Sequence, residues 1–121
     1  MPLAEDVLDA LRRRPAHRLA SGLEVVDIYG SVGVGYAMAF DGRIFEWDLD
    51  IDMREVTDPT RLRLALKLGS KVIPELARLL PFRPAEALDC AECHGTGECG
   101  LGHEVRWLCN TCGGIGWVTA P

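Results

Sequence analysis

The chain has 121 residues, of which 48% are apolar, so it can form one modest hydrophobic core and is too apolar for a disordered tail. No apolar run approaches the roughly 20 residues that a membrane helix needs, and the acidic start does not have the order of a signal peptide. A formal net charge of −5 disfavours nucleic acid as a partner unless basic residues gather locally.

The first expected element is a helix over residues 3–14. Val7, Leu8 and Leu11 recur at helical spacing, and a run of arginines stands at the C-terminal end, where positive charge complements the helix dipole. Pro15 is expected to end this helix.

Three β-rich segments follow, at residues 23–29, 34–40 and 43–52. The last two are joined by Asp41-Gly42, a strong signal for a two-residue hairpin turn. Short connections join antiparallel neighbours, so the sequence predicts a three-stranded antiparallel meander.

The third segment alternates apolar and acidic residues. Its apolar set is Phe45, Trp47, Leu49 and Ile51, and its acidic set is Glu46, Asp48, Asp50 and Asp52. Because successive strand residues point to opposite faces, we expect the apolar set to be buried and the acidic set to be solvated.

The acidic set also allows a divalent-metal site. Gly30-Ser31 after a β-rich segment, followed by Asp50-Ile-Asp52, resembles a minimal nucleotidyltransferase, in which a strand runs into Gly-Ser and an Asp-x-Asp pair holds Mg²⁺. This resemblance implies a nucleotide-dependent enzyme with Asp48, Asp50 and Asp52 as the Mg²⁺ ligands.

A further helix is expected to begin at Pro59, with Asp58 or Thr57 as its N-terminal cap. A Gly-Ser pair at residues 69–70 and Pro74 interrupt its apolar stripe, so we expect two helices or one sharp kink. These helices are expected to cover the apolar face of the third strand.

Charge is distributed unevenly over this part of the chain. Residues 41–58 hold seven acids and two arginines, a net of −5, whereas residues 59–84 hold six basic residues and one glutamate, a net of +5. We expect the two segments to neutralise each other within the fold. The alternative is a nucleic-acid-binding face with four candidate contacts: Arg61, Arg63, Lys67 and Lys71.

The C-terminal part contains the pattern C-x-x-C-x-G-x-G twice. Its four cysteines are Cys90, Cys93, Cys109 and Cys112. Two thiolates separated by two residues reach one metal ion from a single turn, and two such turns supply four sulfurs at tetrahedral positions. The spacing predicts one Zn²⁺ ion. Four thiolates close its coordination shell and suppress its Lewis acidity, so we expect a structural role.

Other chemistries fit these cysteines less well. Cys90-x-x-Cys93-His94 has the form of a haem attachment motif, but this leaves the second pair unexplained. Glycine-rich flanks do not suit a thioredoxin-like redox pair, and five cysteines leave one over from a disulfide framework. Cys99 is expected to be a free thiol, and His94 and His103 are alternative metal ligands.

Over residues 90–117 the repeats resemble the cysteine-rich knuckles of DnaJ-type co-chaperones. Those domains have four knuckles and two zinc ions, whereas two knuckles here are enough for one zinc ion. The His-Pro-Asp signature of a J domain is absent from the sequence. The resemblance implies zinc ligation by the four repeated cysteines and binding to another protein.

These patterns predict an α+β domain at residues 1–84 and a zinc module at residues 85–121. In the module, residues 104–108 are expected to form a strand that pairs with Trp117-Val118, unless the latter pairs with the end of the first knuckle. Trp107 and Trp117 are either its small core or exposed anchors for a partner.

The function predicted from the sequence is non-enzymatic binding of another protein. Chaperone-like, adaptor and toxin-neutralising roles all fit a structural zinc module. Thiols arranged for a metal and not for disulfides favour the reducing cytoplasm as the location.

Overall fold

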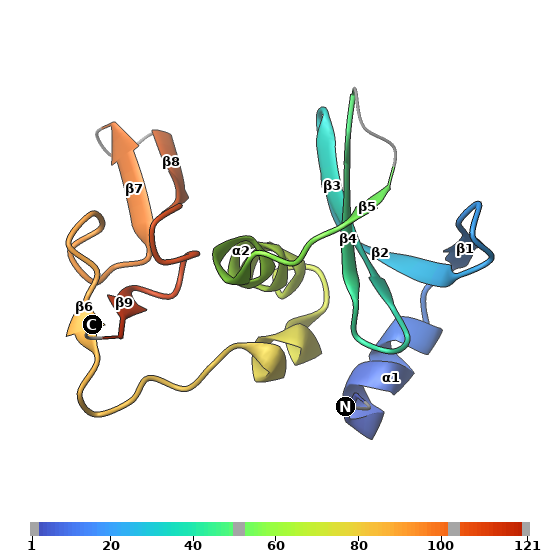
Figure 1. Cartoon of the computed structure of the whole chain (residues 1–121), viewed down its shortest axis with the longest axis horizontal. Helices are drawn as coiled ribbons and strands as arrows, with labels where there is room; N and C mark the ends of the chain where they lie inside the picture. The colour runs from blue at the N-terminus through green and yellow to red at the C-terminus, as the bar shows by residue number, and fades with distance from the viewer. Residues whose placement is uncertain (1–2, 50–52, 102–104, 120–121) are drawn as a thin grey trace.

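The structure, a computed structural model, describes residues 3–49, 53–101 and 105–119. Helix α1 (Glu5–Arg12) precedes a five-stranded antiparallel sheet in the order β1-β2-β3-β4-β5. Helix α2 (Pro59–Gly69) and the 3₁₀ helix η1 (Pro74–Leu79) follow it, and the cysteine-rich part comes last (Figure 1). The sheet strands are β1 (Ala16–Arg18), β2 (Glu24–Ser31), β3 (Val34–Ala39), β4 (Ile44–Asp48) and β5 (Arg54–Glu55).

This architecture confirms the predicted α+β class. The predicted meander corresponds to β2, β3 and β4, and the short strands β1 and β5 extend it at its two edges. The predicted interruption of the second helical region is also confirmed, because α2 ends at Gly69 and η1 begins at Pro74. The carboxylate of Asp58 caps α2 by accepting a hydrogen bond of 3.0 Å from the backbone N–H of Arg61.

The main hydrophobic core lies between the sheet and the helices. Its fully buried members are Val7 and Leu11 of α1, Val26, Ile28 and Met38 of the sheet, Ala65 of α2 and Leu76 of η1. The register of β2 on β3 shifts between Asp27 and Tyr29, which marks a β-bulge. As a result both Ile28 and Tyr29 pack against this core, and Tyr29 lies opposite Tyr36.

The predicted burial of the third strand is confirmed for Phe45, which is 8% exposed, but the face expected to lie under the helices is wrong. In β4 it is Ile44, paired with Met38, that faces the helices, whereas Phe45 packs on the opposite face with Val25 and Ala37. Leu49 follows the end of β4 and is 86% exposed. Alternation gives the period of a strand, but it does not say which face the helices cover. Trp47 lies over the backbone of its strand partner Gly35, and Ile51 lies outside the described residues.

Glu46, expected to be solvated, is instead 5% exposed. Its carboxylate accepts a hydrogen bond of 2.8 Å from Nε of Arg54 and another from the guanidinium of Arg61 in α2. Burial alone would raise the pKa of the Glu46 carboxyl, but the hydrogen bonds and charges of Arg54 and Arg61 outweigh it, so this pKa lies below its ordinary value. The hydrogen bond from Arg61 to this buried carboxylate joins α2 to strand β4 of the sheet.

The cysteine-rich part packs on α2, on the side away from the sheet (Figure 1). A Cβ atom at Gly113 would lie 2.6 Å from Cβ of Arg63 and 2.8 Å from the carbonyl oxygen of Thr60. The second cysteine knuckle therefore lies directly against the backbone of the first turn of α2. The division into residues 1–84 and 85–121 stays a prediction.

Substituting Glu46→Gln removes the negative charge and keeps the shape of the side chain. We expect the free energy of unfolding at neutral pH to fall by about 1.5–3 kcal/mol, the range for hydrogen bonds to charged groups. Since the folded-state pKa of Glu46 is lowered, its contribution is present above the ordinary glutamate pKa and is lost as the pH falls through the folded-state value. Urea titrations at decreasing pH should show the difference from wild type shrinking.

The matched control is Glu55→Gln on β5. Glu55 is exposed and its carboxylate lies 3.9 Å from Arg43. We expect this variant to change the free energy of unfolding by less than about 0.5 kcal/mol. Equal losses in the two variants would mean that the buried ion-pair cluster does not stabilise the fold.

Candidate metal centre

The four repeated cysteines come together in one buried cluster. Cys90, Cys93, Cys109 and Cys112 are each at most 3% exposed, and their sulfur atoms all lie within 4.8 Å of one another. The sulfur–sulfur distance is 3.8 Å for Cys90 with Cys109 and again for Cys93 with Cys112. Four sulfurs about 2.3 Å from a tetrahedral metal are separated by about 3.8 Å, so the cluster has the size of a four-thiolate site.

Backbone amides point at the sulfurs. The N–H of Gly97 donates to Sγ of Cys93, and the N–H of Gly116 donates to Sγ of Cys112, both at 3.2 Å. The two glycines have φ values of +83° and +86°, which place them in the left-handed region. N–H groups that point at a thiolate offset its charge, so these turns prepare the sulfurs for a cation.

The two knuckles form a pair related by pseudo-twofold symmetry. Each sulfur–sulfur contact joins residues 19 apart in sequence. The N–H of Cys90 donates to the carbonyl of Gly116, and the N–H of Cys109 donates to the carbonyl of Gly97, both at 2.9 Å. A Cβ atom at Gly97 would lie 2.5 Å from the carbonyl oxygen of Gly114, so the two backbones approach too closely for any side chain there.

Short strands frame the knuckles. Strand β6 (Leu88–Asp89) pairs with β9 (Trp117–Val118), and β7 (Glu98–Leu101) pairs with β8 (Val105–Leu108). The expected strand after residue 104 is thus confirmed. Trp117-Val118, however, pairs with the segment that enters the first knuckle, and not with this strand or with the end of the first knuckle.

The two tryptophans have different environments. Trp117 is 8% exposed, and its strand β9 pairs with β6, the segment that enters the first knuckle. Trp107 is 45% exposed on the β7–β8 hairpin. Trp117 is therefore buried and Trp107 lies on the surface, and the role of Trp107 as an anchor for a partner stays a prediction.

Burial and hydrogen bonds shift the pKa values of two thiols in the cluster away from the ordinary thiol value. Burial is the largest effect on Cys90 and raises the pKa of its thiol to about 11. Burial acts in the same direction on Cys109, but hydrogen bonds from the backbone of Cys112 and Thr111 outweigh it and lower the pKa of that thiol to about 6. We conclude that the knuckle backbone favours the thiolate form at Cys109.

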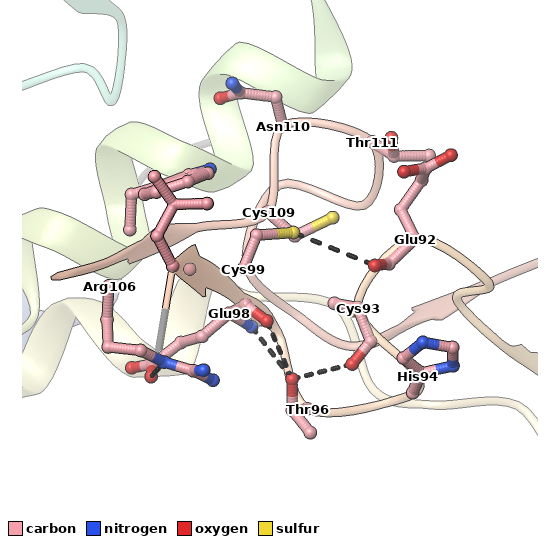
Figure 2. A pocket seen from close by; sticks show the side chains of 13 residues that line it. Glu92, Cys93, His94, Thr96, Glu98, Cys99, Arg106, Cys109, Asn110 and Thr111 are labelled. Atoms are coloured by element: carbon pink, nitrogen blue, oxygen red, sulfur yellow. Dashed lines mark hydrogen bonds and ion pairs between the residues drawn. The ribbon is translucent and has the colours of Figure 1, made fainter. Parts of the chain in front are cut away.

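Cys99 and His94 do not join the cluster. Figure 2 shows Cys99 beside it, with its thiol donating to the carbonyl oxygen of Glu92 at 3.8 Å. His94 is exposed and has a φ value of +55° in the first knuckle. His103 lies outside the described residues, so its place as an alternative ligand stays a prediction.

Of the three proposed Mg²⁺ ligands, Asp48 is among the described residues. Asp48 ends β4, and Asp50 and Asp52 lie outside the described residues. Gly30 and Ser31 lead into the hairpin between β2 and β3, where a nucleotidyltransferase would have a helix. The enzymatic reading of these acids stays a prediction.

The four basic candidates on and after α2 have separate environments. Arg61 is bonded to Glu46, and the side chain of Arg63 contacts the knuckle at Gly113. Lys67 would lie 3.3 Å from a Cβ atom at Gly114, and Lys71 is exposed just beyond the helix. The expected neutralisation between the acidic and basic segments is seen at Glu46 and Arg61. Binding of nucleic acid to this helix stays a prediction.

Comparison with protein-family models, curated proteins and solved structures found no match to this chain, and membership of the DnaJ-type family is not supported. Within the described residues, no helix is long and apolar enough to cross a membrane. The assignment of a candidate metal centre therefore rests on the geometry of the four cysteines.

Substituting Gly97→Ala tests the fit between the two knuckles. The added methyl group would collide with the carbonyl of Gly114, so we expect metal affinity to fall by about 10–100-fold, as for disrupted groups that support metal ligands. Competition with a chromophoric chelator measures the affinity.

Gly22→Ala is the matched control for backbone strain. Gly22 has a φ value of +92°, and a Cβ atom there would meet nothing within 4 Å. We expect this variant to lose some stability and to keep its metal affinity. Equal metal affinity in the Gly97→Ala variant and the wild type would show that the knuckles do not interlock as described.

Proposed function

We propose that this protein is a non-enzymatic zinc protein whose metal holds together a module that binds another protein. The observation that carries the proposal is the cluster of four buried sulfurs at tetrahedral spacing. An all-sulfur tetrahedral site is typical of zinc or iron. We assign zinc because the four-cysteine knuckle pair is the common form of a structural zinc site.

A structural role follows from the donor set. Catalytic zinc keeps one position for water or substrate, whereas four protein thiolates fill all four positions. Four thiolates also place excess negative charge on the ion and weaken it as a Lewis acid. When bound, zinc would cross-link residues 90–112, and the chain supplies the sulfurs and the amides that orient them.

Binding to another protein is supported by the β7–β8 hairpin. Cys99 lies opposite Trp107 and Leu101 opposite Val105, so these four residues share one face of the hairpin. Leu101, Val105 and Trp107 are 76%, 53% and 45% exposed. A cavity of about 640 Å³ is lined by Cys99, Leu101 and Trp107 together with polar residues that include Glu92, Thr96 and Arg106. Figure 2 labels Cys99 and these polar residues. An exposed apolar face of this kind favours a protein partner.

Three roles agree with such a surface: chaperone-like binding, an adaptor, or neutralisation of a toxin. A cytoplasmic location agrees with thiols that hold a metal, because a reducing compartment keeps them from forming disulfides.

We expect the purified protein to contain one zinc ion per chain. Removing it with a chelator should release the knuckles and expose Trp117, which is 8% exposed in the folded module. A red shift in tryptophan emission that is restored by added zinc, and is largely lost in the Trp117→Phe variant, would support the proposal.

Metal analysis that finds no zinc, or iron with the visible absorption of an iron–thiolate site, would contradict it. So would an unchanged emission spectrum after complete removal of zinc.

A further inference from the structure

A groove separates the β7–β8 hairpin from the main sheet. It has a volume of about 610 Å³, within the range of ligand-binding pockets. Leu64 and Leu68 of α2 and the following Lys71 line it below, β8 lines one side, and Tyr29 and Tyr36 of the sheet line the other. Figure 1 shows β8 on the side of the hairpin that faces α2, with β7 on the far side.

The outer edge of β8 is open to this groove. The N–H of Cys109 donates to the carbonyl of Gly97, and hydrogen-bonded pairs alternate along an antiparallel ladder. The next hydrogen-bonded pair along the ladder is therefore Cys99 with Trp107. The backbone N–H and C=O groups of Arg106 and Leu108, which alternate with these pairs, point away from β7. Both residues line the groove, and β8 pairs with β7 alone among the described strands.

The two faces of the hairpin at this edge differ in chemistry. One face presents the apolar side chains of Val105 and Trp107. The other face presents Arg106 and Leu108. The groove is lined by both of these residues, by Trp107 and by Lys71. Glu98 is 3.7 Å from Arg106, and Lys71 makes no ion pair with any residue that the structure describes, so the groove has an uncompensated positive charge.

We propose that an extended segment of a partner protein adds to β8 as a third strand, with apolar and acidic side chains in alternation. Its backbone would bond to the outward N–H and C=O groups of Arg106 and Leu108. Its apolar side chains would extend the face of Val105 and Trp107, and its acidic side chains would enter the groove toward Lys71 and Arg106. This inference rests on the proposed function, because it names the partner's chemistry at the same hairpin.

Two other occupants fit the groove less well. In a second copy added across a twofold axis at β8, the two Arg106 side chains would lie on the same face of the joined sheet, and neighbouring like charges destabilise a strand pair. A nucleic acid would need a row of cations along its backbone, whereas the groove offers Lys71 and an Arg106 that already pairs with Glu98.

The probe is a phage-displayed library of random dodecapeptides, selected on the immobilised zinc-loaded protein. We expect the enriched peptides to share a stretch in which apolar residues alternate with aspartate or glutamate. Recovery of no binder, or of peptides without this alternation, would overturn the proposal. Binding of a mixed oligonucleotide at the same site, in competition with the peptides, would also overturn it.

Two substitutions test the mode of binding with the best selected peptide. Arg106→Pro removes an outward N–H without removing a rung of the ladder with β7, so we expect affinity to fall by about tenfold relative to Arg106→Ala. Lys71→Glu should lower the affinity for the peptide by about tenfold. The control is Arg14→Glu, the same charge change at an exposed arginine beyond α1, which should change the affinity by less than about twofold.

Every variant must keep one zinc ion per chain, which separates this inference from the proposed function. Peptide affinity that is equal in Arg106→Pro and Arg106→Ala, or in Lys71→Glu and Arg14→Glu, would overturn strand addition in the groove. Protein binding through a zinc-held module would survive that result, because it fails on different measurements: the metal analysis and the emission spectrum after removal of zinc.

Discussion

The C-terminal part of this protein is held together where its two C-x-x-C turns bring their four sulfur atoms into one cluster. Four sulfurs without a cation would repel one another as thiolates, and burial already raises the pKa of Cys90. The backbone of both knuckles compensates with N–H groups from Gly97 and Gly116. A bound divalent cation would complete this balance, and the small strands β6 to β9 depend on it because the module has little apolar bulk of its own.

Helix α2 connects this module to the rest of the chain. On one side Ala65 and Leu66 pack into the main core, and Arg61 reaches the buried carboxylate of Glu46. On the other side the backbone of Gly113 lies against Thr60 and Arg63. The same helix lines the groove beside β8, so the position of the hairpin relative to the sheet follows from how the knuckle is seated on α2.

The cluster of four cysteines was predictable from sequence because its members come in local pairs. Each C-x-x-C turn brings two sulfurs together without long-range information, and the matching glycines show that the two turns have the same shape. The interlock of Gly97 with the carbonyl of Gly114 was not predictable in detail, because the pattern identifies the turns and not their mutual contact.

The fold was predictable at the level of helices and the central meander. The burial of β4 was not, because alternation in residues 43–52 has the same period whichever face the helices cover. The burial of Glu46 was not predicted for a second reason. A carboxylate in a strand is expected to face solvent unless an arginine distant in sequence is known to pair with it. The strands β1 and β5 have three and two residues, too few for a periodic signal.

X-ray absorption at the zinc edge of the purified protein tests the central claim most directly. The structure predicts a single shell of four sulfur atoms at about 2.3 Å from the metal, with no nitrogen or oxygen. A shell with fewer than four sulfurs, or one that includes an imidazole or a water molecule, would contradict the closed four-thiolate centre.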